Sequence, residues 1–210
     1  MKRSKPLFIA RQSSSPKGIL GWIIAKIMSS ETAGENEVAV TLLQISDDAT
    51  VLDAGTGHGR TMTQLLKRVP RGKVIGVDAS AVALSIAART LDRALLSGRA
   101  TLHCCDMEAL PLSEASVDAI LTVHTVYFVE NLQVLFREFS RVLRPGGQLL
   151  LVFRPDSDEI DRDYFPEPVF RFRSLEVVRA DALAVGFLEH SCEEDTFKVG
   201  LVTFLSLRRG

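Results

Sequence analysis

The stretch that decides the fold is Val51–Gly59, which reads Val-Leu-Asp-Ala-Gly-Thr-Gly-His-Gly. Its first two residues end an apolar run that is typical of a buried strand, and Asp53 closes that run. Three glycines follow at alternate positions: Gly55, Gly57 and Gly59. Because they lack Cβ atoms, they allow the backbone to turn tightly against a flat ligand. The residues from Arg60 to Val69 then predict a helix that directs its unpaired N–H groups and positive dipole end at that ligand.

A carboxylate stands at the right distance from this turn. The next predicted strand, Lys73–Asp78, ends in an acid about 20 residues past the glycines, where a carboxylate can accept hydrogen bonds from ribose hydroxyls. A dinucleotide-binding loop would carry G-x-G-x-x-G, but here Arg60 occupies the position of the third glycine. The two features together predict a site for a nucleoside with an amino-acid tail and without a pyrophosphate.

Five segments in register carry a family resemblance: Val51–Gly59, Val74–Ser80, Cys105–Leu112, Val117–Ile120 and Val142–Gly147. In this order they resemble the class I S-adenosylmethionine-dependent methyltransferases, and among these the small-molecule branch called methyltransferase type 11. The resemblance implies a Rossmann-like, doubly wound α/β fold. Its sheet would have seven mostly parallel strands, with one antiparallel strand near the edge, and its cofactor would be S-adenosylmethionine.

The alternation of short apolar strands with helical patterns also predicts a mostly parallel α/β sheet. Strands are expected at 50–53, 73–78, 100–104, 117–123, 147–153, about 187–194, and 199–208. Helices are expected near 35–45, 60–69, 80–96, 131–143 and 174–185, and the turn at Pro145–Gly147 ends the fourth of them. The last two strands are too close in sequence for a parallel connection, so they should form a hairpin.

The resemblance also implies which residues bind the cofactor: Asp53, Gly55, Thr56, Gly57, Gly59, Asp78, Ala79, Asp106, Met107 and His124. Asp53 would help to hold the ammonium group through its backbone or a water, and Asp78 would accept from both ribose hydroxyls. Asp106 would accept from the adenine amino group, while Met107 would offer its backbone N–H to the ring. All these residues should lie at the carboxyl ends of strands, where open α/β sheets bind ligands.

The acceptor side carries no comparable signature. Direct displacement at the sulfonium methyl group needs alignment and exclusion of water, and it needs a base only if the acceptor must lose a proton. His124, Tyr127 and Tyr164 are the available side chains, and the backbone carbonyl of His124 near the ammonium group is an alternative role for that residue. The Asp-Pro-Pro-Tyr or Asn-Pro-Pro-Tyr signature for nitrogen methylation of adenine or amides is absent, which disfavours those substrates, and the resemblance implies a small-molecule acceptor. Two rivals stay open: a catalytically inactive S-adenosylmethionine-binding partner protein, and a nicotinamide-dependent oxidoreductase.

Composition narrows the class of protein further. The chain has 210 residues, of which 46% are hydrophobic and 24% charged, as expected for one globular domain over 1–210. The formal net charge of −1 gives no global basic field of the kind that nonspecific nucleic-acid binding requires. Since no apolar run reaches the roughly 18–20 residues of a membrane span, we expect a cytoplasmic protein without stable membrane insertion. The sequence indicates no oligomeric state.

Two segments carry alternative interpretations. Residues 1–30 contain six basic side chains and no acid, and they include the apolar stretch Gly18–Met28. We expect this stretch to form a helix that caps the active site, with membrane contact or targeting as alternatives. The second segment, 154–173, mixes acids with aromatic residues and is expected to be a variable lid. It is either a solvated acidic loop or a rim that attracts a cationic acceptor.

The cysteines and histidines predict no metal. Cys104 and Cys105 are adjacent on a predicted strand, so their side chains should leave on opposite faces, and Cys192 is far away in the sequence. The four histidines show no ligand spacing. We therefore expect three buried, structural thiols in a reducing compartment.

Overall fold

Seven strands form one sheet in the order β3-β2-β1-β4-β5-β7-β6 in the computed structural model, which describes residues 32–156, 169–197 and 200–210. The strands are β1 (Thr50–Ala54), β2 (Lys73–Asp78), β3 (Ala100–Cys104), β4 (Val117–Val123), β5 (Leu143–Phe153), β6 (Phe187–Phe197) and β7 (Gly200–Arg209). Strands β1 to β5 pair in parallel, whereas β7 is antiparallel to both β5 and β6. The predicted mostly parallel sheet with one antiparallel strand near its edge is confirmed.

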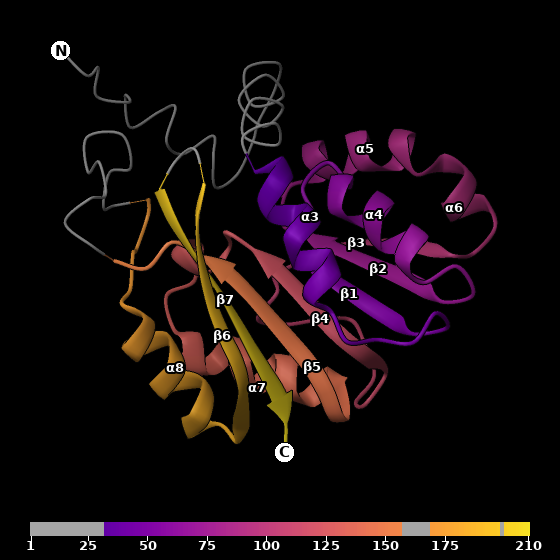
Figure 1. Cartoon of the computed structure of the whole chain (residues 1–210). Coiled ribbons are helices and arrows are strands. Elements are labelled where there is room, and N and C mark those ends of the chain that lie inside the picture. The colour runs from indigo at the N-terminus through magenta and orange to yellow at the C-terminus, as the bar shows by residue number, and fades with distance from the viewer. Residues whose placement is uncertain (1–31, 157–168, 198–199) are drawn as a thin grey trace, which may run out of the picture.

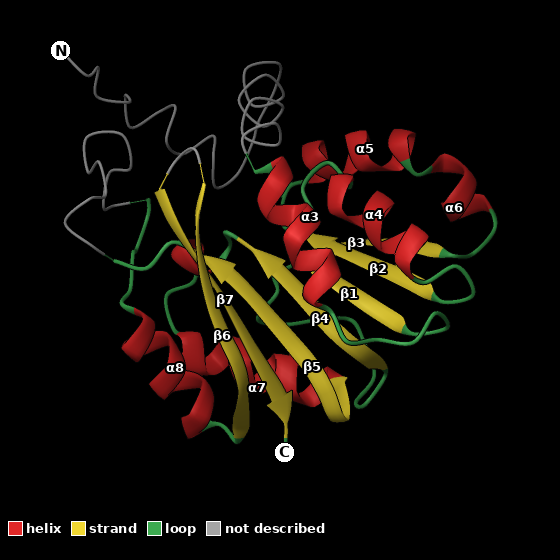
Figure 2. Cartoon of the chain, viewed as in Figure 1, coloured by secondary structure: helices red, strands yellow, loops and turns green. Residues whose placement is uncertain are grey.

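Helices cover both faces of this sheet (Figure 1). Figure 2 shows the same arrangement by element type, with α3, α4 and α5 on one side and α7 and α8 on the other. The helices are α3 (Ala33–Leu42), α4 (Arg60–Arg68), α5 (Ala81–Thr90), α6 (Asp92–Leu96), α7 (Leu132–Val142) and α8 (Leu175–Ala184), with a 3₁₀ turn η1 at Val126–Phe128. The chain therefore forms three layers, with helices on either side of a central sheet.

Neighbouring residues of each central strand point into different cores. In β1, Leu52 packs in the core beneath α7 and α8, whereas Val51 packs in the core beneath α3, α4 and α5. The same alternation separates Ile120 from Leu121 in β4. Because both faces are covered, these strands are continuously apolar in sequence.

One predicted helix is wrong as a single element. The stretch expected at 80–96 divides into α5 and α6, because Leu91 leaves helical geometry at φ −107° and ψ 14°. Asp92 then begins a new short helix, where its carboxylate accepts a 2.7 Å hydrogen bond from the Arg93 N–H. Aspartate favours such helix starts over helix interiors. The side chain of Leu91 is 3% exposed, so burial against the core fixes the break.

The prediction of buried thiols is also wrong. Cys104 is exposed, and Cys105 and Cys192 are half-buried, all three as free thiols. Cys105 follows β3 and lines the cavity, whereas Cys104 and Cys192 lie on β3 and β6, the two edge strands of the sheet. Side chains on an edge strand lack a neighbour on one side, so an apolar residue there is not enclosed.

Two sequence predictions concern residues outside the described part of the chain. The N-terminal basic segment and cap helix at 1–30 lie there, and so do most of the acids of the predicted lid at 154–173. Both stay predictions. Within the described residues, no helix has the length and apolar character needed to cross a membrane.

Candidate active site

A cavity of about 390 Å³ opens at the carboxyl ends of the central strands. It lies where β1 meets β4, the point at which the strand order reverses, and this is where open α/β sheets bind ligands. The start of α3 and the turns after β1, β2, β3 and β4 all contribute to its wall. Of the ten residues expected to bind a cofactor, all except Gly59 line the cavity. Gly59 instead caps α4 with a left-handed backbone at φ 76°.

The glycine turn after β1 is fixed by backbone hydrogen bonds. The N–H groups of Gly55 and Thr56 both donate to the Val77 carbonyl at 2.9 Å, which joins the turn to the end of β2. A Cβ atom on Gly55 would lie 2.3 Å from Cγ2 of Thr125, so a side chain is excluded there. A Cβ atom on Gly57 would meet nothing within 4 Å. Gly55 is thus needed for packing, whereas Gly57 leaves space open beside the cavity.

Asp53 is a buried carboxyl group beneath this turn. It is 2% exposed and accepts a 2.7 Å hydrogen bond from the Thr56 hydroxyl. Burial raises the pKa of Asp53 to about 7, the Thr56 hydrogen bond opposes this, and the charge of Asp78 adds to it. A carboxyl group in this state would gain strongly from a cationic neighbour.

Asp78 forms the acidic end of β2 on the same cavity. Its Oδ2 accepts from the Gly57 N–H at 2.9 Å and its Oδ1 from the Ser80 N–H at 2.8 Å. Burial raises the pKa of Asp78, and these two backbone bonds, together with the nearby His58, oppose that rise. Each carboxylate oxygen can accept a further hydrogen bond, so two bonds from a bound molecule can still be accommodated.

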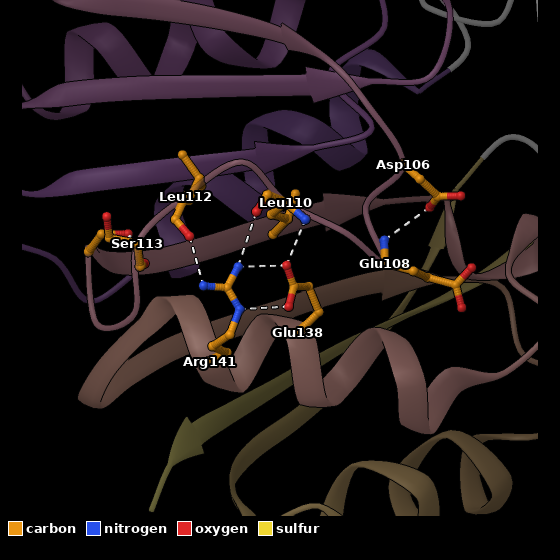
Figure 3. A network of polar contacts seen from close by, with 8 residues as sticks. Asp106, Glu108, Leu110, Leu112, Ser113, Glu138 and Arg141 are labelled. Atoms are coloured by element: carbon orange, nitrogen blue, oxygen red, sulfur yellow. Dashed lines mark hydrogen bonds and ion pairs between the residues drawn. The ribbon is translucent and has the colours of Figure 1, made fainter.

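Asp106 and Met107, in the loop after β3, line the cavity. Two side chains of α7 bond to this loop (Figure 3). Glu138 of α7 accepts from the Leu110 N–H at 2.6 Å, and Arg141 donates to the Leu112 carbonyl at 2.7 Å. The two side chains also pair with each other, with Arg141 Nη2 2.7 Å from Glu138 Oε1. This clamp orients the loop, while Asp106 itself is exposed at the cavity edge.

A buried polar network lies beside the cavity at the ends of β4 and β5. Glu35 of α3 is 0% exposed, and its carboxylate pairs with His124 Nε2 and, at 2.5 Å, with Arg154 Nη2. Burial alone would raise the pKa of Glu35, but the hydrogen bonds and charges of His124 and Arg154 outweigh it and lower that pKa. Glu35 is therefore ionised and balanced by the Arg154 guanidinium.

The shortest contacts of this network favour one neutral tautomer of His124, although Arg154 Nη1 also lies 3.3 Å from Nε2. The backbone N–H of Arg154 donates to the Tyr127 hydroxyl at 2.6 Å, so that hydroxyl can donate its own proton to His124 Nδ1, 3.0 Å away. His124 Nε2 then carries the ring proton and donates it to Glu35. Burial lowers the pKa of His124, which favours this neutral ring.

The two candidate bases predicted from the sequence thus form a hydrogen bond with each other: His124 accepts it and Tyr127 donates it. Neither ring nitrogen of His124 has a lone pair left for an acceptor, and Tyr127 is buried and does not line the cavity. Burial also raises the pKa of Tyr127 far above its ordinary value. The backbone of His124 is strained, with φ 55°, and the residue lines the cavity.

Sequence reasoning missed several residues of this site: Glu35, Asn36, His58 and Arg154. Glu35 and Asn36 stand at the beginning of a predicted helix, a position at which acids are common for reasons unrelated to a site. Arg154 directly follows β5, and a charged residue at the carboxyl end of a central strand is a signal that could have identified it. His58 lies inside the glycine turn itself. Among the described residues, no group of three or more His, Cys, Asp or Glu side chains could hold a metal ion.

Comparisons with known proteins support a class for this fold. A family model described as a methyltransferase domain, of type 11, matches residues 52–151. The ubiquinone/menaquinone biosynthesis C-methyltransferase UbiE of Syntrophotalea carbinolica is 39% identical over 114 residues, which are 54% of this chain and 47% of that protein. The chain therefore spans about half the length of this curated relative.

Two solved structures share the fold. The geranyl diphosphate C-methyltransferase of Streptomyces coelicolor, in complex with S-adenosyl-L-homocysteine, superposes with a TM-score of 0.71 at 18% identity and covers 85% of this chain and 77% of that one. The [4+2]-cyclase SpnF superposes with a TM-score of 0.73 at 18% identity, covering 84% of this chain and 80% of the other. The sheet order and the glycine turn define a Rossmann-like methyltransferase fold. The match over residues 52–151, together with these relatives, supports a class I methyltransferase, the family whose methyl donor is S-adenosylmethionine.

Proposed function

We propose that this chain transfers a methyl group from S-adenosylmethionine to a small-molecule acceptor. The observation that carries the proposal is the cavity in which the G-x-G-x-G turn, Asp78 and the Asp106 loop converge. Asp53, Asp78 and Asp106 are three of the four carboxyl groups that line the cavity. They could accept from the three donor groups of the cofactor, which are its ammonium, its ribose hydroxyls and its adenine amino group. The 39% identical relative is named as a C-methyltransferase of quinone biosynthesis, which supports a small-molecule acceptor.

Each carboxyl group has a proposed partner on the cofactor. Asp53 would hold the ammonium group, helped by the His124 backbone carbonyl, and Asp78 would accept from both ribose hydroxyls. Asp106 would accept from the adenine amino group, with the Met107 N–H at the ring. When bound, the sulfonium group supplies an already activated methyl donor.

The protein's own contribution would be orientation and exclusion of water. Because His124 and Tyr127 satisfy each other, we propose that neither acts as a general base; His124 instead fixes the wall of the cavity through its strained main chain. The ring of Phe128 forms another part of the wall and lies 5.3 Å from the ring of Phe170. Phe170 is buried behind it, so the ring of Phe128 would pack against an apolar or flat part of the acceptor.

Two rival functions use the same half-domain. A nicotinamide-dependent oxidoreductase is disfavoured because Arg60 begins α4 where the third dinucleotide glycine would stand. A cofactor-binding protein without methyl transfer is the stronger rival. The cyclase SpnF, a protein named for another reaction, shares this fold, and a fold alone does not decide the reaction.

Binding and transfer can be tested separately. We expect isothermal titration calorimetry to detect S-adenosylhomocysteine, and we expect label from methyl-tritiated S-adenosylmethionine to appear in a member of a metabolite panel that includes quinone precursors. Binding without transfer to any member would favour the cofactor-binding protein. Micromolar binding of NAD without binding of S-adenosylhomocysteine would contradict the proposal altogether.

The pH dependence of cofactor binding tests the role of Asp53. Its pKa in the unliganded protein is raised to about 7, so below pH 7 the group is mostly protonated and must release a proton before it can pair with an ammonium group. We therefore expect the Kd for S-adenosylhomocysteine to rise about tenfold between pH 8 and pH 6. Because the pKa of Asp53 is raised, the folded state binds more protons than the unfolded chain between about pH 4 and 7. The free energy of unfolding of the unliganded protein should therefore fall as the pH rises through this range.

The control for this prediction is Asp53→Asn, which keeps the shape of the side chain and cannot titrate. Asp78 also has a raised pKa and His58 a lowered one. The pH dependence of the Kd that remains in the Asp53→Asn variant therefore measures the contribution of these two groups. A wild-type Kd that stays constant from pH 6 to pH 8 would place the ammonium group away from Asp53.

A further inference from the structure

Two buried polar atoms on the cavity wall have no hydrogen-bond partner within the described part of the protein. They are Oδ1 of Asn36 and Nε2 of His58. Asn36 is the more deeply buried of the two residues, at 6% exposed. A buried oxygen without a donor costs free energy, and such atoms in folded proteins call for an explanation. A bound molecule that supplies a donor would explain this one.

The place of Asn36 is fixed by its neighbours on α3. Glu35, the preceding residue, is anchored to His124 at the end of β4 and to Arg154 at the end of β5. Ala39 and Val40, four residues further on, pack into the core beneath the helix. Residues four apart share a helix face, so Ala39 shares the face of Glu35 and Val40 shares the face of Asn36. Core packing therefore fixes the orientation of both faces. Asn36 is therefore held at the cavity before any ligand binds.

Only one donor on the cofactor suits this location. An amide oxygen accepts hydrogen bonds, and the cofactor offers donors at its ammonium, its ribose hydroxyls and its adenine amino group. The ribose and adenine belong at Asp78 and Asp106, at the ends of β2 and β3. Because Glu35 anchors α3 at the ends of β4 and β5, we infer that Asn36 faces the part of the cavity away from β2 and β3, where the amino-acid tail would lie.

On the basis of the proposed function, we propose that Asn36 is a specificity residue that binds the amino-acid tail of the cofactor. Its Oδ1 accepts from the ammonium group, and its Nδ2 donates to the carboxylate. A carboxamide suits this tail, because the tail carries one positive and one negative charge and the amide pairs with both without adding a charge. Asp53 and Glu35 already place two carboxyl groups nearby.

Two ligands that differ only in this tail provide the test. S-adenosylhomocysteine carries the amino-acid group, whereas 5′-methylthioadenosine has a methyl group in its place. We expect calorimetry on the full chain to show that Asn36→Ala weakens S-adenosylhomocysteine binding about tenfold or more and methylthioadenosine binding less than twofold. The melting temperature of the unliganded variant should stay the same or rise, because the substitution removes an unsatisfied buried atom.

Asp78→Ala is the matched control, since it acts at the ribose that both ligands share and should weaken both alike. Equal loss of the two ligands in Asn36→Ala, or loss of neither, would overturn the assignment. A lower melting temperature with unchanged S-adenosylhomocysteine binding would overturn it as well, because Asn36 would then be structural. If the wild-type chain binds neither ligand, the proposed function itself fails, which distinguishes the two outcomes.

Discussion

Glu35→Ala is expected to lower the free energy of unfolding by about 3–5 kcal/mol, the usual cost of removing one partner of a buried ion pair. The side chain of Glu35 is 0% exposed, and its carboxylate is the shared acceptor for His124 and Arg154. Its removal leaves a guanidinium without its counter-charge and a ring N–H without its acceptor. The effect should also reach the cavity, because the same contacts hold the beginning of α3 against the sheet.

Urea unfolding followed by circular dichroism would measure this loss. Glu35→Gln is the matched control: it keeps an oxygen that can accept from His124 and loses only the charge that balances Arg154, so its loss should be smaller. The double variant Glu35→Ala/Arg154→Leu removes both charges and should be less destabilised than the sum of the two single variants. Additive single losses would mean that the ion pair contributes nothing.

The pH dependence of this stabilisation has a definite sign. The pKa of Glu35 is lowered in the folded protein from an ordinary value of 4.5. The ion pair therefore stabilises the folded state above about pH 4.5, and this contribution is lost as the pH falls through the lowered pKa. Glu35→Gln should remove that part of the acid sensitivity.

Much of the fold could be predicted because its signals are local. The glycine turn follows a buried strand directly, and Asp78 stands at a fixed distance along the same strand-helix-strand unit. The hairpin of β6 and β7 follows from a short connection alone. Each of these features is determined by residues close together in sequence, so a pattern is sufficient to identify them.

The polar network could not be predicted, because its members meet only in the folded chain. Glu35 and His124 are 89 positions apart, and Glu35 and Arg154 are 119 positions apart. The sequence does place His124 and Tyr127 near the end of β4, which is correct. It could not reveal that each satisfies the other, which is the observation that argues against either as a base. The broken helix at Leu91 and the exposed Cys104 likewise depend on which neighbours the fold supplies.

Asp78→Ala is expected to weaken S-adenosylhomocysteine binding by about 2–4 kcal/mol, or roughly 30- to 900-fold, if both ribose hydroxyls donate to this half-buried carboxylate. The substitution also removes the acceptor for the Gly57 and Ser80 N–H groups, so part of the loss could come from a looser glycine turn. Calorimetry with the 2′-deoxy analogue of the ligand separates these contributions. This analogue lacks one of the two hydroxyls, so it should lose less affinity than the parent compound when Asp78 is replaced.

The parent ligand and its 2′-deoxy analogue, each measured with the wild-type protein and with Asp78→Ala, form a thermodynamic cycle. The interaction energy of this cycle measures the contact between the ribose hydroxyl and the Asp78 carboxylate. A looser glycine turn would weaken the binding of both ligands equally, and the cycle would then give no interaction energy. A loss below tenfold for the parent ligand would mean that Asp78 is not at the ribose, and its two backbone hydrogen bonds would then be its whole role. A large loss with a clear interaction energy would instead make Asp78 the residue that identifies the ligand as a ribonucleoside. We expect this second outcome, because a Cβ atom on Gly57 would meet nothing within 4 Å, and Gly57 lies beside the carboxylate that accepts from its N–H.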